Sequence, residues 1–290
     1  NPLRSERDVF RAVVVIGIGA GAVIALALLT RHRDELDGLI VDLDGVVWIG
    51  PDAVPGSVAA ISELRARGVR LVFLTNDPST SRADCTERLH ALGVAVDESE
   101  VVPSGSALAA FVAEHEPRGA GTFVIGSRSL KRELAQVGLT LLDGDAGRDA
   151  DVVAVGGHSG FDYGELLVAT QALRRGARLY AAGRDATFPM PDGPWPATGA
   201  VVAAVEVAGC TQAIAVGKPE PFMFELARSL LDGCERIAVV GDNVASDIAG
   251  GRRAGLTTIL VLSGTSLRED IHGADLVPDV VLPDLAALVR

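Results

Sequence analysis

Lysine and cysteine are both scarce in this chain of 290 residues. The only lysines are Lys131 and Lys218, so arginine carries almost all of the positive charge. The three cysteines, Cys85, Cys210 and Cys234, are far apart and form no CxxC pair, which excludes the cysteine spacing of a disulfide framework. We interpret them as reduced thiols and predict a cytoplasmic protein.

The chain also lacks positive charge overall, with a net charge of −12. A surface of this sign repels nucleic acid and anionic membranes, so we expect no nucleic-acid partner. The five histidines are scattered, and none stands at ligand spacing from a cysteine or another histidine, which argues against zinc. Because the overall charge of the chain repels anions, an anionic ligand would need a local positive site, such as a bound metal ion.

Apolar segments alternate with helical patterns from Leu36 to the end of the chain. Strands that are apolar throughout predict a parallel sheet covered on both faces. The section from 106 to 199 repeats this alternation with strands and helices of its own. We therefore predict a doubly wound parallel-sheet (Rossmann-like) α/β core, residues 36–105 and 200–290, with an inserted α/β cap domain at residues 106–199.

Residues 1–35 form a separate N-terminal segment that contains an uninterrupted apolar run, Ala12–Leu29. A helix of this length suits a single membrane anchor, and the apolar length also suits a signal peptide, although no clean cleavage site follows. A third interpretation is the strand, glycine-rich turn and helix of a dinucleotide site, formed by Gly17, Gly19 and Gly21. That fingerprint requires its third glycine where Ala22 stands, so we favour a membrane-associated or dispensable segment.

Four predicted strand or loop ends carry polar residues suited to phosphate chemistry. In chain order they are Asp42-Leu43-Asp44-Gly45, Thr75-Asn76-Asp77, Gly217-Lys218-Pro219, and Gly241-Asp242-Asn243 followed by Asp247. Each has an ordinary structural explanation when taken alone, such as a turn or a solvated surface charge. Ligand sites in parallel sheets lie beyond the carboxyl ends of the strands, however, and phosphoryl transfer needs a nucleophile, a proton donor and neutralisation of negative charge. Together the four motifs supply all three.

These motifs resemble those of the haloacid-dehalogenase superfamily, and more narrowly its subfamily IIA, the NagD-like and p-nitrophenylphosphatase-like group. The segments VVAVGGHSGFDY, RDATFPMPDG and GKPEPFMFE strengthen the resemblance, which covers the chain from about Leu36 onward. It implies a Mg²⁺-dependent phosphomonoesterase that acts on a small phosphorylated metabolite through an aspartyl-phosphate intermediate. It also makes a cap-mediated homodimer unsurprising.

By matching position, the resemblance gives each motif residue a role. Asp42 would be the nucleophile, and Asp44 the general acid and then the base. Thr75, with the adjoining Asn76, would bind the phosphoryl oxygens, and Lys218 would offset their negative charge.

The resemblance also implies a metal site and a cap contact. Asp42, the main-chain carbonyl of Asp44, and Asp242 would bind Mg²⁺, and Asp247 would orient its water shell. Asp185 occupies the cap loop that contacts the substrate.

Two alternatives remain open. Asp77 stands where the family commonly has Asn or Ser, and it adds negative charge close to a phosphate site. Together with the apolar segment at residues 12–29, it motivates the hypothesis of a membrane-tethered phosphate-binding or regulatory protein with weak turnover. The second alternative is a dinucleotide-dependent oxidoreductase built on Gly17–Gly21.

Overall fold

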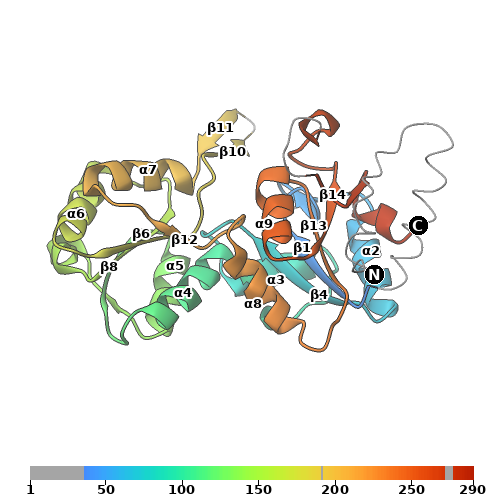
Figure 1. Cartoon of the computed structure of the whole chain (residues 1–290), viewed down its shortest axis with the longest axis horizontal. Helices are drawn as coiled ribbons and strands as arrows, with labels where there is room; N and C mark the ends of the chain where they lie inside the picture. Colours follow the sequence, from blue (N-terminus) through green and yellow to red (C-terminus); the bar gives the residue numbers. More distant parts are fainter. Residues whose placement is uncertain (1–35, 191, 272–276) are drawn as a thin grey trace, which may run out of the picture. The chain divides into compact units, whose positions relative to one another are not determined.

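The structure of the chain is a computed structural model that describes residues 36–190, 192–271 and 277–290 (Figure 1). The apolar run Ala12–Leu29 lies outside these residues, and so do all three interpretations offered for it. Within the described ranges, no helix combines the length and the apolar character needed to cross a membrane.

The chain folds into two compact units. Among the described residues, the first unit comprises those up to Leu74, together with Leu89–Val96 and Ala227–Arg290. The second unit comprises Thr75–Arg88 and Asp97–Leu226. These units and the predicted domains divide the chain at different residues, so the domain boundaries at 105/106 and 199/200 stay a prediction.

A parallel sheet forms the centre of the first unit. The strands that this unit contributes to the sheet are β1 (Gly38–Asp42), β4 (Arg70–Thr75), β13 (Ile237–Gly241), β14 (Thr257–Val261) and β15 (Val280–Leu282). They are hydrogen-bonded in the order β15-β14-β13-β1-β4, and every pair is parallel. All five residues of β1 are buried, which explains why this strand is apolar up to its final aspartate.

Helices and short strands complete the first unit. They are the hairpin β2 (Trp48–Ile49) and β3 (Asp52–Ala53), α2 (Ser57–Ala66), the single π-helical turn η4 (Val244–Ile248), α9 (Ala249–Arg253), and the 3₁₀ turns η5 (Arg268–Ile271) and η6 (Leu285–Leu288). Ile61 and Leu64 lie on the buried face of α2, which packs against η6. Two further helices, α3 (Arg82–Ala91) and α8 (Pro221–Leu230), each have residues in both units.

The second unit has a parallel sheet of its own, ordered β12-β9-β8-β6-β7. The strands are β6 (Gly121–Gly126), β7 (Thr140–Leu141), β8 (Val152–Gly157), β9 (Arg178–Ala181) and β12 (Ile214–Ala215). The other elements are η2 (Glu98–Glu100), β5 (Val101–Pro103), α4 (Ser104–His115), α5 (Arg128–Gln136), η3 (Gly144–Asp149), α6 (Tyr163–Arg174), the hairpin β10 (Thr187–Met190) and β11 (Gly193–Pro196), and α7 (Thr198–Gly209). Two parallel sheets, each combined with helices, confirm the predicted fold class.

The core of the second unit lies between its sheet and the pair α6 and α7, which pack against each other. Val153 and Val155 of β8 contribute side chains to this core, together with Ala169 from α6 and Val202 from α7. Small and β-branched side chains of this kind permit close packing of helices on a sheet. The second unit therefore has an apolar core of its own.

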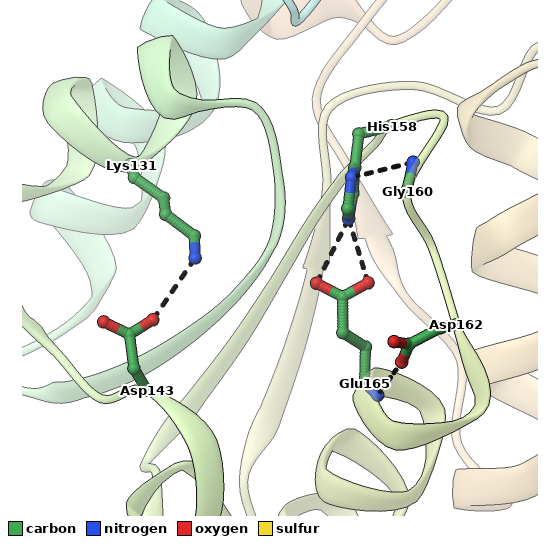
Figure 2. Close-up of polar contacts among 6 residues, drawn as sticks. All are labelled: Lys131, Asp143, His158, Gly160, Asp162 and Glu165. Atoms are coloured by element: carbon green, nitrogen blue, oxygen red, sulfur yellow. Dashed lines mark hydrogen bonds and ion pairs between the residues drawn. The ribbon is translucent and has the colours of Figure 1, made fainter.

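The loop between β8 and α6 is fixed by His158 (Figure 2). Its Nε2 lies 3.1 and 2.9 Å from the two carboxylate oxygens of Glu165, and the main-chain N–H of Gly160 donates to its Nδ1 at 3.2 Å. Asp162 caps α6 by accepting a hydrogen bond from the Glu165 main chain at 2.9 Å. Because Nδ1 accepts a hydrogen bond, the ring proton lies on Nε2, where it faces Glu165.

A buried tyrosine in the second unit makes the stability of the chain depend on pH. Tyr180 is 1% exposed, and its hydroxyl donates to the carboxylate of Glu116, which also accepts from Arg178. Burial, followed by the hydrogen bond and the negative charge of Glu116, raises the pKa of Tyr180 from 10.0 to about 12. The folded chain therefore holds this proton at pH values where the unfolded chain releases it.

We expect the free energy of unfolding to fall as the pH rises from about 10 to about 12, by about 1.4 kcal/mol for each unit of pKa difference. Urea unfolding at a series of pH values measures this, and Tyr180→Phe is expected to flatten the decline. Tyr163, the other tyrosine of the chain, is 79% exposed, so Tyr163→Phe is the matched control. An equally steep decline in Tyr180→Phe would contradict the assignment.

Candidate active site

Two aspartates meet at the carboxyl edge of the sheet in the first unit. Asp42 is the last residue of β1, and Asp242 directly follows β13, the strand beside it. The two parallel strands are in register, with Val41 opposite Val240, so the residues that follow them reach the same edge. Asp42 is 6% exposed and Asp242 is 4% exposed.

A third carboxylate completes this group. Asp247 comes from η4, whose N-cap is Asn243, and its side chain is fully buried. One carboxylate oxygen from each of Asp42, Asp242 and Asp247 lies within 4.8 Å of the others. We call these three residues the carboxylate cluster. In the part of the chain that the structure describes, it is the one group of three or more acidic, histidine or cysteine side chains close enough to share a metal ion.

Backbone groups and glycines hold Asp242 in place. The main-chain N–H of Thr265 donates to its Oδ2, and that of Ser266 donates to its carbonyl oxygen at 3.0 Å. A Cβ atom added to Gly264 would lie 2.0 Å from Oδ2, and one added to Gly45 would lie 2.3 Å from it. Only glycine permits so close an approach of the main chain to this carboxylate.

The loop Gly264–Ser266, which follows β14, was missed by the sequence analysis. The available signal was a Gly-Thr-Ser run after a buried strand.

Asp247 is oriented by the turn that leads to it. The main-chain N–H of Asn243 donates to its Oδ2 at 3.1 Å, and a Cβ atom on Gly241 would lie 2.2 Å from its Cβ. The side chain of Asn243 accepts hydrogen bonds from the main chain of Ala245 and Ser246 and so starts η4. The turn therefore directs Asp247 back toward the strand end.

The carboxylate cluster fits a hard divalent cation such as Mg²⁺. Three carboxylates buried close together repel one another, and burying such charges is costly unless they are paired or coordinate a metal. Carboxylate oxygens are the ligands that Mg²⁺ and Ca²⁺ prefer. The three side chains offer carboxylate oxygens alone.

Asp44 lies apart from the carboxylate cluster in both exposure and partners. It is exposed, and the indole N–H of Trp48 donates to its Oδ1 at 2.8 Å. The main-chain N–H of Gly45 donates to the Trp48 carbonyl at 2.7 Å, which closes the turn. Trp48 stands only four residues after Asp44 in the sequence. The metal contact predicted for the Asp44 main-chain carbonyl stays a prediction.

The second predicted motif ends β4. Thr75 is the last residue of that strand and is 2% exposed, and its Oγ1 accepts from the main-chain N–H of Asp77 at 3.0 Å. The carboxylate of Asp77 in turn accepts from the main-chain N–H and the hydroxyl of Ser79, at 2.8 and 2.6 Å. This Asx turn gives Asp77 a local structural role.

The two lysines of the chain lie in different surroundings. Lys131 is partly exposed and forms an ion pair with Asp143 at 3.2 Å (Figure 2), an interaction of small energetic value. Lys218 is only 3% exposed. A lysine is almost never buried to this extent without a specific reason, so its burial agrees with the prediction of a functional residue.

Three of the predicted residues form one hydrogen-bonded group in the second unit. The Nδ2 of Asn76 donates to the carboxylate of Asp185 at 2.8 Å and to the carbonyl of Lys218 at 2.9 Å. Its Oδ1 accepts from the main-chain N–H of Lys218 at 2.9 Å. These contacts join residues that are 109 and 142 positions apart in the sequence.

Comparison with known proteins identifies the chain. A haloacid dehalogenase-like hydrolase family matches residues 39–140, and a related HAD-hydrolase-like family matches residues 215–288. An acid sugar phosphatase from Staphylococcus saprophyticus is 30% identical, over 87% of this chain and 96% of its own length. A glycerol-3-phosphate phosphatase from Gallus gallus is 34% identical, over 88% of this chain and 91% of its own.

A solved structure agrees with these relatives. The glycerol phosphate phosphatase from Mycobacterium tuberculosis, in complex with magnesium, superposes with a TM-score of 0.83 at 32% identity, covering 89% of this chain and 77% of its own. The fold and the carboxylate cluster thus define a Rossmann-like α/β protein with a site suited to a divalent cation. The chain belongs to the haloacid dehalogenase-like hydrolase family, which confirms the resemblance predicted from its motifs, and it is a phosphatase.

Proposed function

We propose that this phosphatase hydrolyses the phosphomonoester of a sugar or of glycerol, that it requires Mg²⁺, and that it forms an aspartyl-phosphate on Asp42. The carboxylate cluster is the observation that carries this proposal, because it combines a strand-end nucleophile with the ligands of a hard cation. The substrate class is suggested by the acid sugar phosphatase and the two glycerol phosphate phosphatases.

A bound Mg²⁺, held by Asp42, Asp242 and the Asp44 main-chain carbonyl with Asp247 behind its water shell, would neutralise negative charge on the phosphoryl group. An oxygen of Asp42 attacks phosphorus as the ester P–O bond breaks, which leaves the phosphoryl group on Asp42. Asp44 gives its proton to the departing alkoxide. It then removes a proton from water, whose oxygen attacks phosphorus and releases inorganic phosphate and the free carboxylate of Asp42.

The surroundings of Asp44 suit this exchange of a proton. Its Oδ1 is held by the indole N–H of Trp48, and its exposure gives the leaving alcohol and the incoming water access to it. The Trp48 contact therefore fixes the orientation of the carboxyl group that transfers the proton.

The remaining predicted residues bind and orient the substrate in this proposal. Thr75, with the main chain that follows it, binds phosphoryl oxygens, and Lys218 offsets their negative charge. Residues 106–199 act as the cap that selects the substrate, with Asp185 in the selecting loop.

A panel of phosphate esters tests the proposal. The panel would hold glycerol 3-phosphate, several sugar phosphates, phosphoglycolate, a nucleoside monophosphate, pyridoxal phosphate and p-nitrophenyl phosphate. We expect Mg²⁺-dependent release of phosphate, with kcat/KM for a sugar or glycerol phosphate about 10-fold or more above the other metabolites, because hydrogen bonds to substrate hydroxyls discriminate strongly. A higher value for the nucleotide or for pyridoxal phosphate would contradict the substrate class. Absence of turnover on every ester would contradict the function.

The other predictions rest on no observation of this structure. The tether and the dinucleotide turn both fall on residues outside the described ranges, and the relatives are phosphatases. The homodimer and the cytoplasmic location stay predictions.

A further inference from the structure

The side chain of Asn76 has almost no hydrogen-bonding capacity left for a substrate. A carboxamide offers two N–H donors and one carbonyl acceptor. Both donors of Asn76 have partners at normal distances, the Asp185 carboxylate at 2.8 Å and the Lys218 carbonyl at 2.9 Å. The acceptor receives the Lys218 main-chain N–H at 2.9 Å. Direct binding of phosphoryl oxygens by Asn76 would require one of the two bonds that it donates to break.

Two of the three bonds pair the carboxamide with both polar main-chain groups of a single residue, Lys218. The side chain of Asn76 thus acts toward Lys218 as a neighbouring peptide group would act in a sheet. A carboxylate of the same shape could accept from the N–H but could not donate to the carbonyl, and an aliphatic side chain could do neither. The arrangement is specific for a side-chain amide at this length.

The main chain before Lys218 is built to reach this carboxamide. A Cβ atom on Gly217 would lie 3.0 Å from Asn76 Oδ1 and 2.1 Å from the carbonyl oxygen of Ala182. Any residue other than glycine would therefore push the loop away from Asn76. Because Lys218 is 3% exposed, its side chain has little room to compensate for a displaced main chain.

The third bond joins the same carboxamide to the base of the hairpin β10–β11. Asp185 precedes that hairpin, and its carbonyl accepts the main-chain N–H of Gly199 in α7 at 2.9 Å. A Cβ atom on Gly199 would lie 2.3 Å from the carbonyl oxygen of Arg184, so this contact too is close. Asp185 is therefore held at its main chain by α7 and at its side chain by Asn76.

We infer that Asn76 is a positioning residue, which holds the main chain of Lys218 and the carboxylate of Asp185 through one carboxamide. The inference rests on the proposed function, in which Lys218 offsets the charge of the phosphoryl group. It assigns to Asn76 a task different from the substrate binding predicted from the sequence. It also makes Asp185 a determinant of activity through Asn76.

The test uses the full chain and p-nitrophenyl phosphate. In Asn76→Asp, a second carboxylate faces Asp185 and the donor to the Lys218 carbonyl is lost. We expect kcat/KM to fall about 100-fold at pH 8, because a displacement of a positioned group by about 1 Å commonly costs this much activity. Because two adjacent carboxylates cannot both ionise readily, the ratio of variant to wild-type activity is expected to rise as the pH falls and one of them is protonated.

The double variant Asn76→Asp/Asp185→Asn exchanges the two side chains and tests whether the lost activity can be restored. It restores a donor and an acceptor between positions 76 and 185, and the carboxylate at position 76 still accepts from Lys218. We expect the double variant to recover about 10-fold of the lost kcat/KM, and its activity ratio to lose the pH dependence. Asp149→Asn, on a side chain that is 83% exposed, is the control for the Asp→Asn change and is expected to match wild type.

The outcomes distinguish failure of the proposed function from failure of the inference about Asn76. A wild-type chain that does not hydrolyse p-nitrophenyl phosphate overturns the proposed function. A working wild type whose Asn76→Asp variant keeps its kcat/KM and pH profile overturns the inference alone. A double variant no better than Asn76→Asp overturns the link to Asp185. If Asn76→Asp is not recovered folded, Asp185→Ala takes its place. A loss of about 10-fold in kcat with unchanged KM and thermal stability supports the inference, whereas wild-type activity, or a rise in KM alone as from a lost substrate contact, overturns it.

Discussion

Asp42→Asn is expected to lower kcat/KM for p-nitrophenyl phosphate by about 10⁴-fold or more. The amide that replaces the carboxylate has almost the same shape, but it is a far weaker nucleophile. The substitution also removes one of the three negative charges of the carboxylate cluster. Release of inorganic phosphate under saturating Mg²⁺ measures the effect.

The loss must be separated from an effect on folding. Asp42 is buried, so circular dichroism and thermal unfolding of the variant should accompany the assay. Asp145→Asn makes the same chemical change on a side chain that is 85% exposed, and it is expected to leave the activity unchanged. A folded Asp42→Asn variant that turns over at the wild-type rate would show that Asp42 is not the nucleophile.

Asp242→Asn is expected to abolish the stabilisation of the protein by Mg²⁺. A ligand that binds only the folded state at 100 times its Kd raises the free energy of unfolding by about 2.7 kcal/mol, so wild type should gain several degrees of Tm with saturating Mg²⁺. Loss of a carboxylate ligand should weaken Mg²⁺ binding by more than about 100-fold, since even the outer partners of metal sites matter by 10-fold to 100-fold. Thermal unfolding with and without Mg²⁺ measures this independently of turnover.

The same experiment also compares the Tm of the variant with that of wild type in the absence of metal. Without metal, three carboxylates lie within 4.8 Å of one another, so the removal of one negative charge should raise the Tm of Asp242→Asn above that of wild type. Asp145→Asn again serves as the control, with the Mg²⁺ response of wild type expected. An unchanged Mg²⁺ response in Asp242→Asn would remove Asp242 from the metal site.

The sequence predicted the fold class and the positions of the strand-end residues because these depend on local pattern. A buried parallel strand such as Gly38–Asp42 is apolar along its whole length, so a polar residue at its end is conspicuous. The same logic located Thr75 and Asp242. Lys218 is one of only two lysines in the chain, but its burial could not be derived from the sequence.

Other features depend on contacts between distant segments. The loop Gly264–Ser266 binds Asp242 from across more than 20 residues, and Asn76 meets Asp185 and Lys218 across more than 100. Nothing in the residues between them encodes such pairings.

The sequence by itself thus determined which residue types end the strands, because hydrophobic periodicity and turn chemistry act over a few residues. Only the tertiary structure decided which of those side chains meet. It brought Asp247 to Asp42 and Asp242, and it used the whole carboxamide of Asn76 in holding other residues. The physical reason is that the energy of a charge or a hydrogen bond depends on distance and burial, and packing sets both.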